Sequence, residues 1–428
     1  MLIKRCTINK YIILIFTFII AFAMIVFSEN IIIHIISILF MCSVAVGLVG
    51  FDLIHPYFWF SGFFTLYSVA YPIIVAMGFP SKIVYSKDVM IYQLVALFTI
   101  LFVVSPNSVS TYKKEKMYNI KFDIGVFNRL IYMALIILIV LAAAYVSKAG
   151  FGGKDEIYAS GNMILTKMFR LPLILAFLYT LSVISEYSKS RKLPIGQIIF
   201  TGAALCFITL FSGERDFIFR FLLLTIFMLW VLNILTLKGL LIITPVFALA
   251  IPLSSAYKYF FLRGSVSNTS DNILYSFLAG EFESAARNLQ VLINNASSVK
   301  GCKGIGFVFS DIISVFYSGI DSATSWFDQT FYSNTTTQYG FTLVGEGYIM
   351  GGMTGIIFLF ILIGILVKVF YINAYKNVYT LSSYLYFITV IIYAIRCDFG
   401  LILSAVTKQI GLVVFILWFA ERLSKKRE

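Results

Sequence analysis

Apolar stretches close to 20 residues long fill most of the chain, and short polar segments separate them. The stretches do not alternate with a period of two residues, so they predict helices that cross a bilayer core about 30 Å thick. We predict about twelve spans, at residues 11–27, 31–50, 57–77, 90–104, 130–146, 168–185, 195–211, 217–237, 239–256, 344–367, 383–395 and 399–419. The predicted fold is an all-α integral membrane protein, with residues 1–428 forming one polytopic domain.

One polar interruption, residues 257–343, is far longer than the others. It follows the first nine predicted spans and precedes the last three, and we expect it to contain short helices. A membrane protein that keeps one large loop on one side usually works at that face.

Composition supports the membrane assignment. The chain is 60% hydrophobic and 12% charged, whereas soluble domains average about 45–50% apolar and 25% charged residues. Its formal charge of +13 does not indicate a nucleic-acid partner, because most Lys and Arg lie in short segments between apolar stretches. The basic clusters at 113–121, 189–192 and 422–427 fall on one side, which predicts cytoplasmic termini and an external long loop.

The first apolar stretch follows basic residues as a signal peptide would, but no small-residue cleavage site follows it. We therefore interpret it as an uncleaved first span. The cysteines show no C-x-x-C spacing and no even set in the long loop, so neither a disulfide framework nor a metal site is predicted. These cysteines are Cys6, Cys42, Cys206, Cys302 and Cys397.

The long loop contains a segment of helical period from Asn272 to Asn294. Its apolar stripe consists of Leu274, Leu278, Phe282, Ala285, Leu289 and Leu292. Glu281 falls at the edge of the stripe, where an apolar surface would raise its pKa and suit a general base. The alternative is an interfacial Glu281 that reaches water. Glu283 and Arg287 fall on the opposite face, where they are either a solvated pair or part of a site.

A second candidate site precedes the predicted span at 217–237. Ser212 is a plausible N-cap, with Arg215 in the following turn and Arg220 a little over one turn deeper. A helix N-terminus with two arginines suits a phosphate or diphosphate. Alternatively, Arg220 simply pairs with Asp216 four residues earlier.

The third candidate is the start of the span after the loop. Gly347, Gly351 and Gly355 form a G-x-x-x-G-x-x-x-G pattern, for which close helix packing is the favoured interpretation. Glu346 is harder to explain by packing, because an acid in a membrane segment is costly and tends to be functional.

Other charges lie within or beside predicted spans. Arg170 is about one turn inside its span, Arg396 and Asp398 flank the external end of the last span, and Lys408 lies near that span's middle. Each is either a functional group or half of a structural ion pair. His34 and His55 are the two histidines of the chain, and neither lies in the long loop.

The arrangement resembles the O-antigen polymerases of bacterial surface-polysaccharide assembly, in which twelve spans carry one large external loop before the last three. Local features are also similar. They are Gly213-Glu214-Arg215 at a span start, the stretch Tyr339-Gly340-Phe341 followed by Gly345-Glu346-Gly347-Tyr348, and the small loop 147–167 with Gly150, Gly152, Gly153 and Tyr158.

The resemblance implies a fold of the lipid-linked-sugar glycosyltransferase (GT-C-like) type in the bacterial inner membrane. It implies transfer of a growing glycan from undecaprenyl diphosphate to the next lipid-linked repeat unit at the periplasmic face, without metal or nucleotide. A flippase and a chain-length regulator are the expected partners. In this interpretation the catalytic candidates are Glu281, Arg215 and Arg287. The substrate-binding candidates are Arg170, Arg220, Arg263, Glu346, Tyr348, Arg396 and Lys408.

Related ligases carry a functional His in the long loop, and this chain has none there. An Arg-x(10)-Gly pattern found in some polymerases is absent at Arg263 and Arg287. The main alternative is a flippase of lipid-linked oligosaccharides. The long loop and the lack of an internal repeat argue against it.

Overall fold

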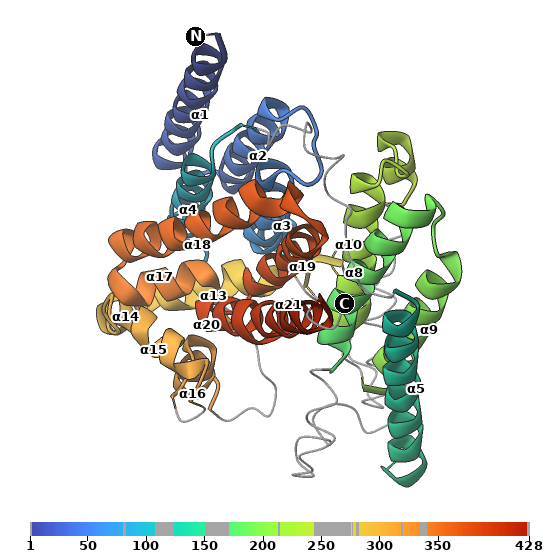
Figure 1. The fold of residues 1–428 in the computed structure, drawn as a ribbon. Helices are drawn as coiled ribbons and strands as arrows, with labels where there is room; N and C mark the ends of the chain where they lie inside the picture. The colour runs from blue at the N-terminus through green and yellow to red at the C-terminus, as the bar shows by residue number, and fades with distance from the viewer. Residues whose placement is uncertain are drawn as a thin grey trace. The chain divides into compact units, whose positions relative to one another are not determined.

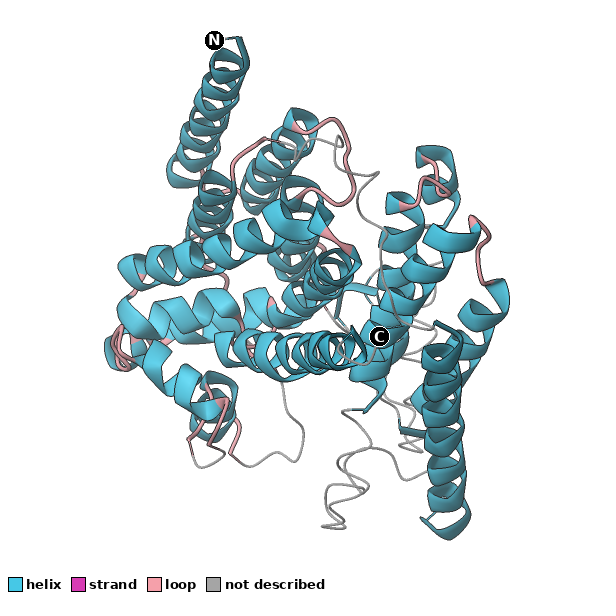
Figure 2. Cartoon of the chain, in the orientation of Figure 1, coloured by secondary structure: helices cyan, strands magenta, loops and turns pink. Residues whose placement is uncertain are grey.

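The computed structural model describes residues 2–79, 83–107, 124–149, 171–212, 215–243, 275, 277–279, 282–317, 320–333 and 340–425. In this part of the chain every regular element is a helix and no strand occurs (Figure 2). The helices, labelled in Figure 1, are α1 (Leu2–Phe27), α2 (Ile31–Leu48), α3 (Pro56–Ala76), α4 (Asp88–Val104), α5 (Ile124–Ala149), α8 (Leu171–Ser190), α9 (Ile195–Ser212), α10 (Asp216–Val231), α13 (Glu283–Asn294), α14 (Ala296–Val299), α15 (Phe307–Ser314), α16 (Ala323–Phe331), α17 (Leu343–Gly351), α18 (Met353–Asn373), α19 (Val378–Ala394), α20 (Phe399–Ser404) and α21 (Leu412–Lys425).

Seven helical stretches among the described residues are long and apolar enough to cross a membrane. They are Ile8–Phe27, Ile31–Leu48, Pro56–Ala76, Phe127–Ala144, Leu171–Ser190, Met353–Lys376 and Phe399–Ala420. The stretches Asp88–Val104, Ile195–Leu210 and Val378–Ala394 are shorter and also apolar. The described helices therefore have the character of a multi-pass, all-α membrane protein. Most of the predicted span at 239–256 lies outside the described residues.

The chain divides into two compact units, and each combines segments that are distant in sequence. Unit 1 contains residues 1–110, 272–372 and 390–405, and unit 2 contains residues 111–271, 373–389 and 406–428. In unit 1, α13 packs against α3, α4 and α17. In unit 2, α5 and α10 each pack against both α8 and α9.

Hydrogen bonds place parts of unit 1 at opposite ends of α4. At its C-terminal end, Lys368 Nζ donates to the Val103 carbonyl (3.0 Å), and just beyond it Lys10 Nζ donates to the Pro106 carbonyl (3.5 Å). Just before its N-terminal end, Ser86 N donates to Gln290 Oε1 of α13 (2.7 Å). Lys10 and Lys368 thus lie near one end of α4, and the long-loop helix α13 lies near the other.

The predicted span at 344–367 is not one helix, and this corrects the sequence interpretation. The chain breaks at Gly352, whose φ of +62° favours glycine, and α17 and α18 lie on either side of the break. A Cβ added to Gly355 would lie 2.1 Å from the Gly347 carbonyl oxygen, and one on Gly347 would lie 2.6 Å from Ile356 Cα. The glycine pattern therefore permits close packing of α17 against α18, as predicted. The break leaves Glu346 outside the membrane-crossing stretch Met353–Lys376.

Two other local predictions change. Ser212 is the last residue of α9, and the N-cap position of α10 is Arg215, so Ser212 does not cap that helix. The helix predicted over 272–294 is described as α13 from Glu283, with residues 275 and 277–279 also helical. The described members of its apolar stripe are all buried, which confirms that face; they are Leu278, Phe282, Ala285, Leu289 and Leu292.

Candidate functional site

Three carboxyl side chains from distant parts of the sequence interact in unit 1. Asp311 lies on α15, Glu346 on α17 and Asp398 at the N-cap of α20. Their exposed fractions are 1%, 0% and 5%. Burial of carboxyl groups is costly unless they are hydrogen-bonded or protonated, so the cluster has to be explained.

Backbone amides at the start of α20 bind two of these groups. Glu346 Oε2 accepts from Phe399 N (2.7 Å), and Asp398 Oδ1 accepts from Leu401 N (3.0 Å). Asp398 Oδ2 also accepts from Thr324 N (3.2 Å) and Thr324 Oγ1 (2.7 Å), at the start of α16. The carboxyl groups thus join the helices that follow the long loop to helices inside it.

Asp311 and Glu346 form a pair that needs a proton. Asp311 Oδ2 and Glu346 Oε1 are both buried. If both carboxyl groups were ionised, each could only accept, and neither of these two oxygens would have a hydrogen-bond donor among the described residues. The two side chains hydrogen-bond to each other. This hydrogen bond raises the pKa of Glu346 and lowers the pKa of Asp311, so Glu346 is the member that holds the proton. A neutral Glu346 that donates to the Asp311 carboxylate satisfies both groups.

The pKa values follow from this arrangement. Burial raises the pKa of Asp311 to about 6, the hydrogen bond from Glu346 opposes that rise, and the charge of Asp398 adds to it. Burial also raises the pKa of Glu346 well above its ordinary value, and repulsion from Asp311 raises it further. At neutral pH Glu346 is therefore neutral and Asp311 is largely ionised.

Such a pair suits general base chemistry. A carboxylate with a pKa near 6 is a stronger base than an ordinary aspartate and is still mostly ionised at pH 7. The other interpretation is purely structural, because the same hydrogen bonds hold α15, α16, α17 and α20 together. Among the described residues, no group of three or more His, Cys, Asp or Glu side chains is arranged to hold a metal ion.

Cationic residues of unit 1 lie on neighbouring elements. The Arg396 carbonyl accepts from Phe341 N (2.9 Å), next to α17, and its half-buried guanidinium lies 4.8 Å from the Tyr393 ring centroid. Arg287 of α13 pairs with Glu283 (3.2 Å), and both side chains are mostly buried, so the pair is not the solvated one considered above. Tyr348 is buried against Tyr92, with ring centroids 5.3 Å apart.

The remaining described candidates belong to unit 2. Arg220 and Asp216 form a buried pair, with Arg220 Nε 2.9 and 2.8 Å from the two Asp216 carboxylate oxygens. The ion-pair interpretation of Arg220 is therefore confirmed. Arg215 is half-buried, and Lys408 is exposed on the π-helix Ala405–Gly411.

Three predicted site residues, Glu281, Arg170 and Arg263, lie outside the described residues. Asp311 was not among the sequence candidates. A local signal could have identified it: Asp311 is the one charged residue between Ile305 and Tyr317, a segment that is otherwise largely apolar.

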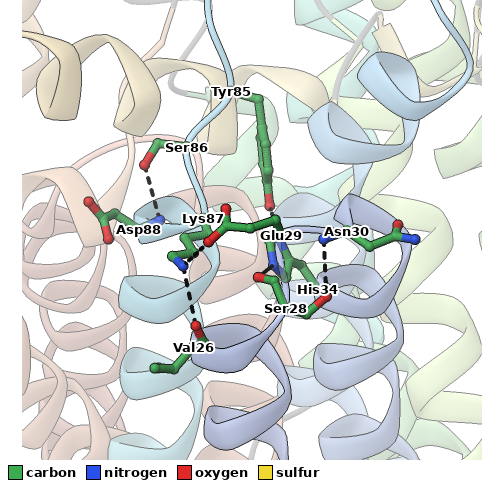
Figure 3. A network of polar contacts seen from close by, with 9 residues as sticks. All are labelled: Val26, Ser28, Glu29, Asn30, His34, Tyr85, Ser86, Lys87 and Asp88. Carbon is green, nitrogen blue, oxygen red and sulfur yellow. Dashed lines mark hydrogen bonds and ion pairs between the residues drawn. The ribbon is translucent and has the colours of Figure 1, made fainter.

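A second polar network in unit 1 accounts for His34 (Figure 3). His34 Nε2 donates to the Ser28 carbonyl (2.9 Å), because a carbonyl oxygen can only accept, and His34 Nδ1 is hydrogen-bonded to Tyr85 Oη (2.9 Å). Lys87 Nζ contacts Glu29 Oε1 (2.5 Å) and donates to the Val26 carbonyl (3.2 Å). Both ring nitrogens of His34 are therefore engaged in joining the α1–α2 turn to the segment before α4.

Comparison with known proteins identifies no relative: no protein family, no curated protein and no solved structure matches this chain. The functional argument therefore rests on the residues and their geometry.

Proposed function

We propose that this protein is a membrane glycosyltransferase that polymerises lipid-linked oligosaccharide repeat units. It transfers the growing glycan from undecaprenyl diphosphate to the next undecaprenyl-diphosphate-linked unit at the periplasmic face of the bacterial inner membrane. The observation that carries the proposal is the proton-sharing pair Asp311–Glu346, which lies where the long loop meets the helices that follow it.

The reaction needs a base and a stabilised leaving group. The bond between the sugar anomeric carbon and the diphosphate oxygen breaks, and a bond forms from that carbon to the acceptor hydroxyl oxygen. The hydroxyl proton passes to Asp311, while undecaprenyl diphosphate leaves with the electron pair. Glu346 keeps its proton and orients the Asp311 carboxylate through their hydrogen bond.

Arginines are the groups expected to offset the diphosphate charge. In unit 1, we assign this role to Arg396 and Arg287. Arg396 lies two residues before Asp398, and Arg287 lies on α13, which packs against α17. Asp311 rather than Glu346 is the base in this proposal, because Glu346 is the protonated member of the pair. Arg215 and Arg220 belong to unit 2, where Arg220 is already paired with Asp216.

Activity of purified protein on an undecaprenyl-diphosphate-linked repeat unit tests this mechanism. We expect kcat to rise with pH through about 6 as Asp311 ionises, and Asp311→Asn to lose chain extension while Glu346→Gln keeps part of it. Asp321→Asn, an exposed carboxyl in the same loop, is the matched control and should behave as wild type. Normal chain extension by Asp311→Asn would remove Asp311 from the site.

Deletion of the gene tests the reaction class. Loss of the polysaccharide ladder, with a single repeat unit still attached, supports a polymerase. Loss of the repeat unit itself supports a flippase, the second candidate. The observation that favours a flippase is the buried Arg220–Asp216 pair in α10, because buried ion pairs often line transport pathways in membrane proteins.

A further inference from the structure

Helix α15 has two faces of different character. The face that carries Asp311 also carries Phe307, Val308 and the following Val315, and all four side chains are buried. On the other face, Phe309 is 69% exposed and Ile312 and Ile313 are exposed as well. In the adjoining residues Phe316 is 81% and Tyr317 62% exposed, and Ile305 is also exposed. The spacing of the exposed residues follows a single helical stripe.

The neighbours of α15 indicate what covers this stripe. α15 packs against α20, and a Cβ on Gly400 would lie 3.4 Å from Asp311 Oδ1. α20 is the first part of Phe399–Ala420, one of the stretches long and apolar enough to cross a membrane. A helix that packs beside the first turn of a span lies at the depth where that span enters the bilayer.

Residues around the stripe are also of the types found where a span enters the bilayer. Lys303 precedes it, and its ammonium lies 5.7 Å from the Phe307 ring centroid and 5.3 Å from that of Trp326. Lys300 is also exposed. Lysines and aromatic rings are characteristic of the boundary between headgroups and acyl chains, where the cations meet lipid phosphates.

We propose that α15 is an interfacial helix whose exposed face, together with the adjoining Ile305, Phe316 and Tyr317, lies in the lipid of the membrane surface. The predicted occupant of this face is phospholipid, with acyl chains against the phenylalanines and isoleucines and phosphate groups beside Lys300 and Lys303. The same helix then has lipid on one face and the carboxyl cluster on the other. This inference holds for any membrane protein with this geometry and does not require the proposed glycosyltransferase activity.

Lipid-depth measurements test the proposal. The native cysteines Cys6, Cys42, Cys206, Cys302 and Cys397 are first replaced by serine or alanine. Single cysteines are then placed at Phe309, Phe316 and, as a control, Gln329, an exposed polar position on α16. Each variant is labelled with an environment-sensitive fluorophore and reconstituted in vesicles of phosphatidylcholine and phosphatidylglycerol.

For Phe309→Cys and Phe316→Cys, we expect a lipid-borne nitroxide near the headgroup to reduce the emission by about twofold or more, as for side chains about 5–10 Å deep in the interface. Aqueous iodide should have little effect on these two labels, and the label at Gln329 should show the reverse pattern. Strong iodide quenching at 309 and 316 would place the stripe in water and overturn the proposal. Protection from both quenchers would mean that protein covers the stripe, through a second copy or a partner, and would also overturn it. Unfolding midpoints equal to that of the cysteine-free parent show that each variant is folded.

Discussion

The shared proton of Asp311 and Glu346 makes a quantitative prediction about stability. The Asp311 side chain has a pKa of about 6 in the folded protein and 3.8 when unperturbed. Because folding raises this pKa, the folded state binds the proton more tightly than the unfolded state does. The stabilisation is fully present below about pH 4 and is lost as the pH rises through about 6.

The difference of about 2 pKa units corresponds to about 3 kcal/mol over the whole window. Between about pH 4.5 and pH 7.5, integration of the linkage gives a loss of about 2 kcal/mol in the free energy of unfolding. Asp311→Asn cannot ionise, so its stability should lack this part of the pH dependence. The variant should therefore gain about 2 kcal/mol relative to wild type over the same pH range.

The assay is unfolding in mixed micelles with increasing SDS, followed by far-ultraviolet circular dichroism at the two pH values. Asp321→Asn, which removes an exposed carboxyl from the same loop, controls for the loss of one charge and should follow the wild-type pH dependence. Equal pH dependence in wild type and Asp311→Asn would refute the reasoning. A constant destabilisation of Asp311→Asn at both pH values would likewise show that the Asp311 proton is not the cause.

Two further predictions concern packing and the buried ion pair, both measured by the same unfolding assay. Gly355→Ala places a Cβ 2.1 Å from the Gly347 carbonyl oxygen and should cost about 3 kcal/mol or more. Gly62→Ala in α3, where nothing lies within 4 Å, should be neutral or slightly stabilising; equal effects of the two substitutions would contradict the close α17–α18 contact. Arg220→Met leaves Asp216 buried without its partner and should cost about 3–5 kcal/mol. The double variant Arg220→Met/Asp216→Leu should recover most of that loss, and no recovery would show that the cost arises elsewhere.

Much of the fold follows from local sequence properties. The length of an apolar stretch and its lack of charge suffice to predict a membrane helix, because backbone groups in lipid must be hydrogen-bonded within the segment. The long stretches at Ile31–Leu48, Pro56–Ala76 and Met353–Lys376 are examples that the structure also forms as helices. The glycine spacing at Gly347 and Gly355 likewise predicted close packing before any contact was known.

Other features depend on the neighbours of a residue. The apolar run 344–367 predicts one continuous helix, yet the chain turns at Gly352, because contacts between Gly347, Gly355 and Ile356 fold α17 against α18. Ser212 has the side chain of an N-cap, but α9 continues through it. Side-chain chemistry alone does not decide which of two adjacent helices such a residue joins.

The candidate site shows most clearly which features follow from the local sequence and which depend on tertiary packing. The sequence by itself determined that the chain is a helical membrane protein with a long polar loop, and that Glu346 and Asp398 lie near the ends of apolar segments. The tertiary structure alone brought Asp311 to Glu346, because the two are 35 residues apart (311 to 346) and no local period relates them. A pKa shift arises from burial and from the charges nearby, and both are set by packing between helices that the sequence does not place.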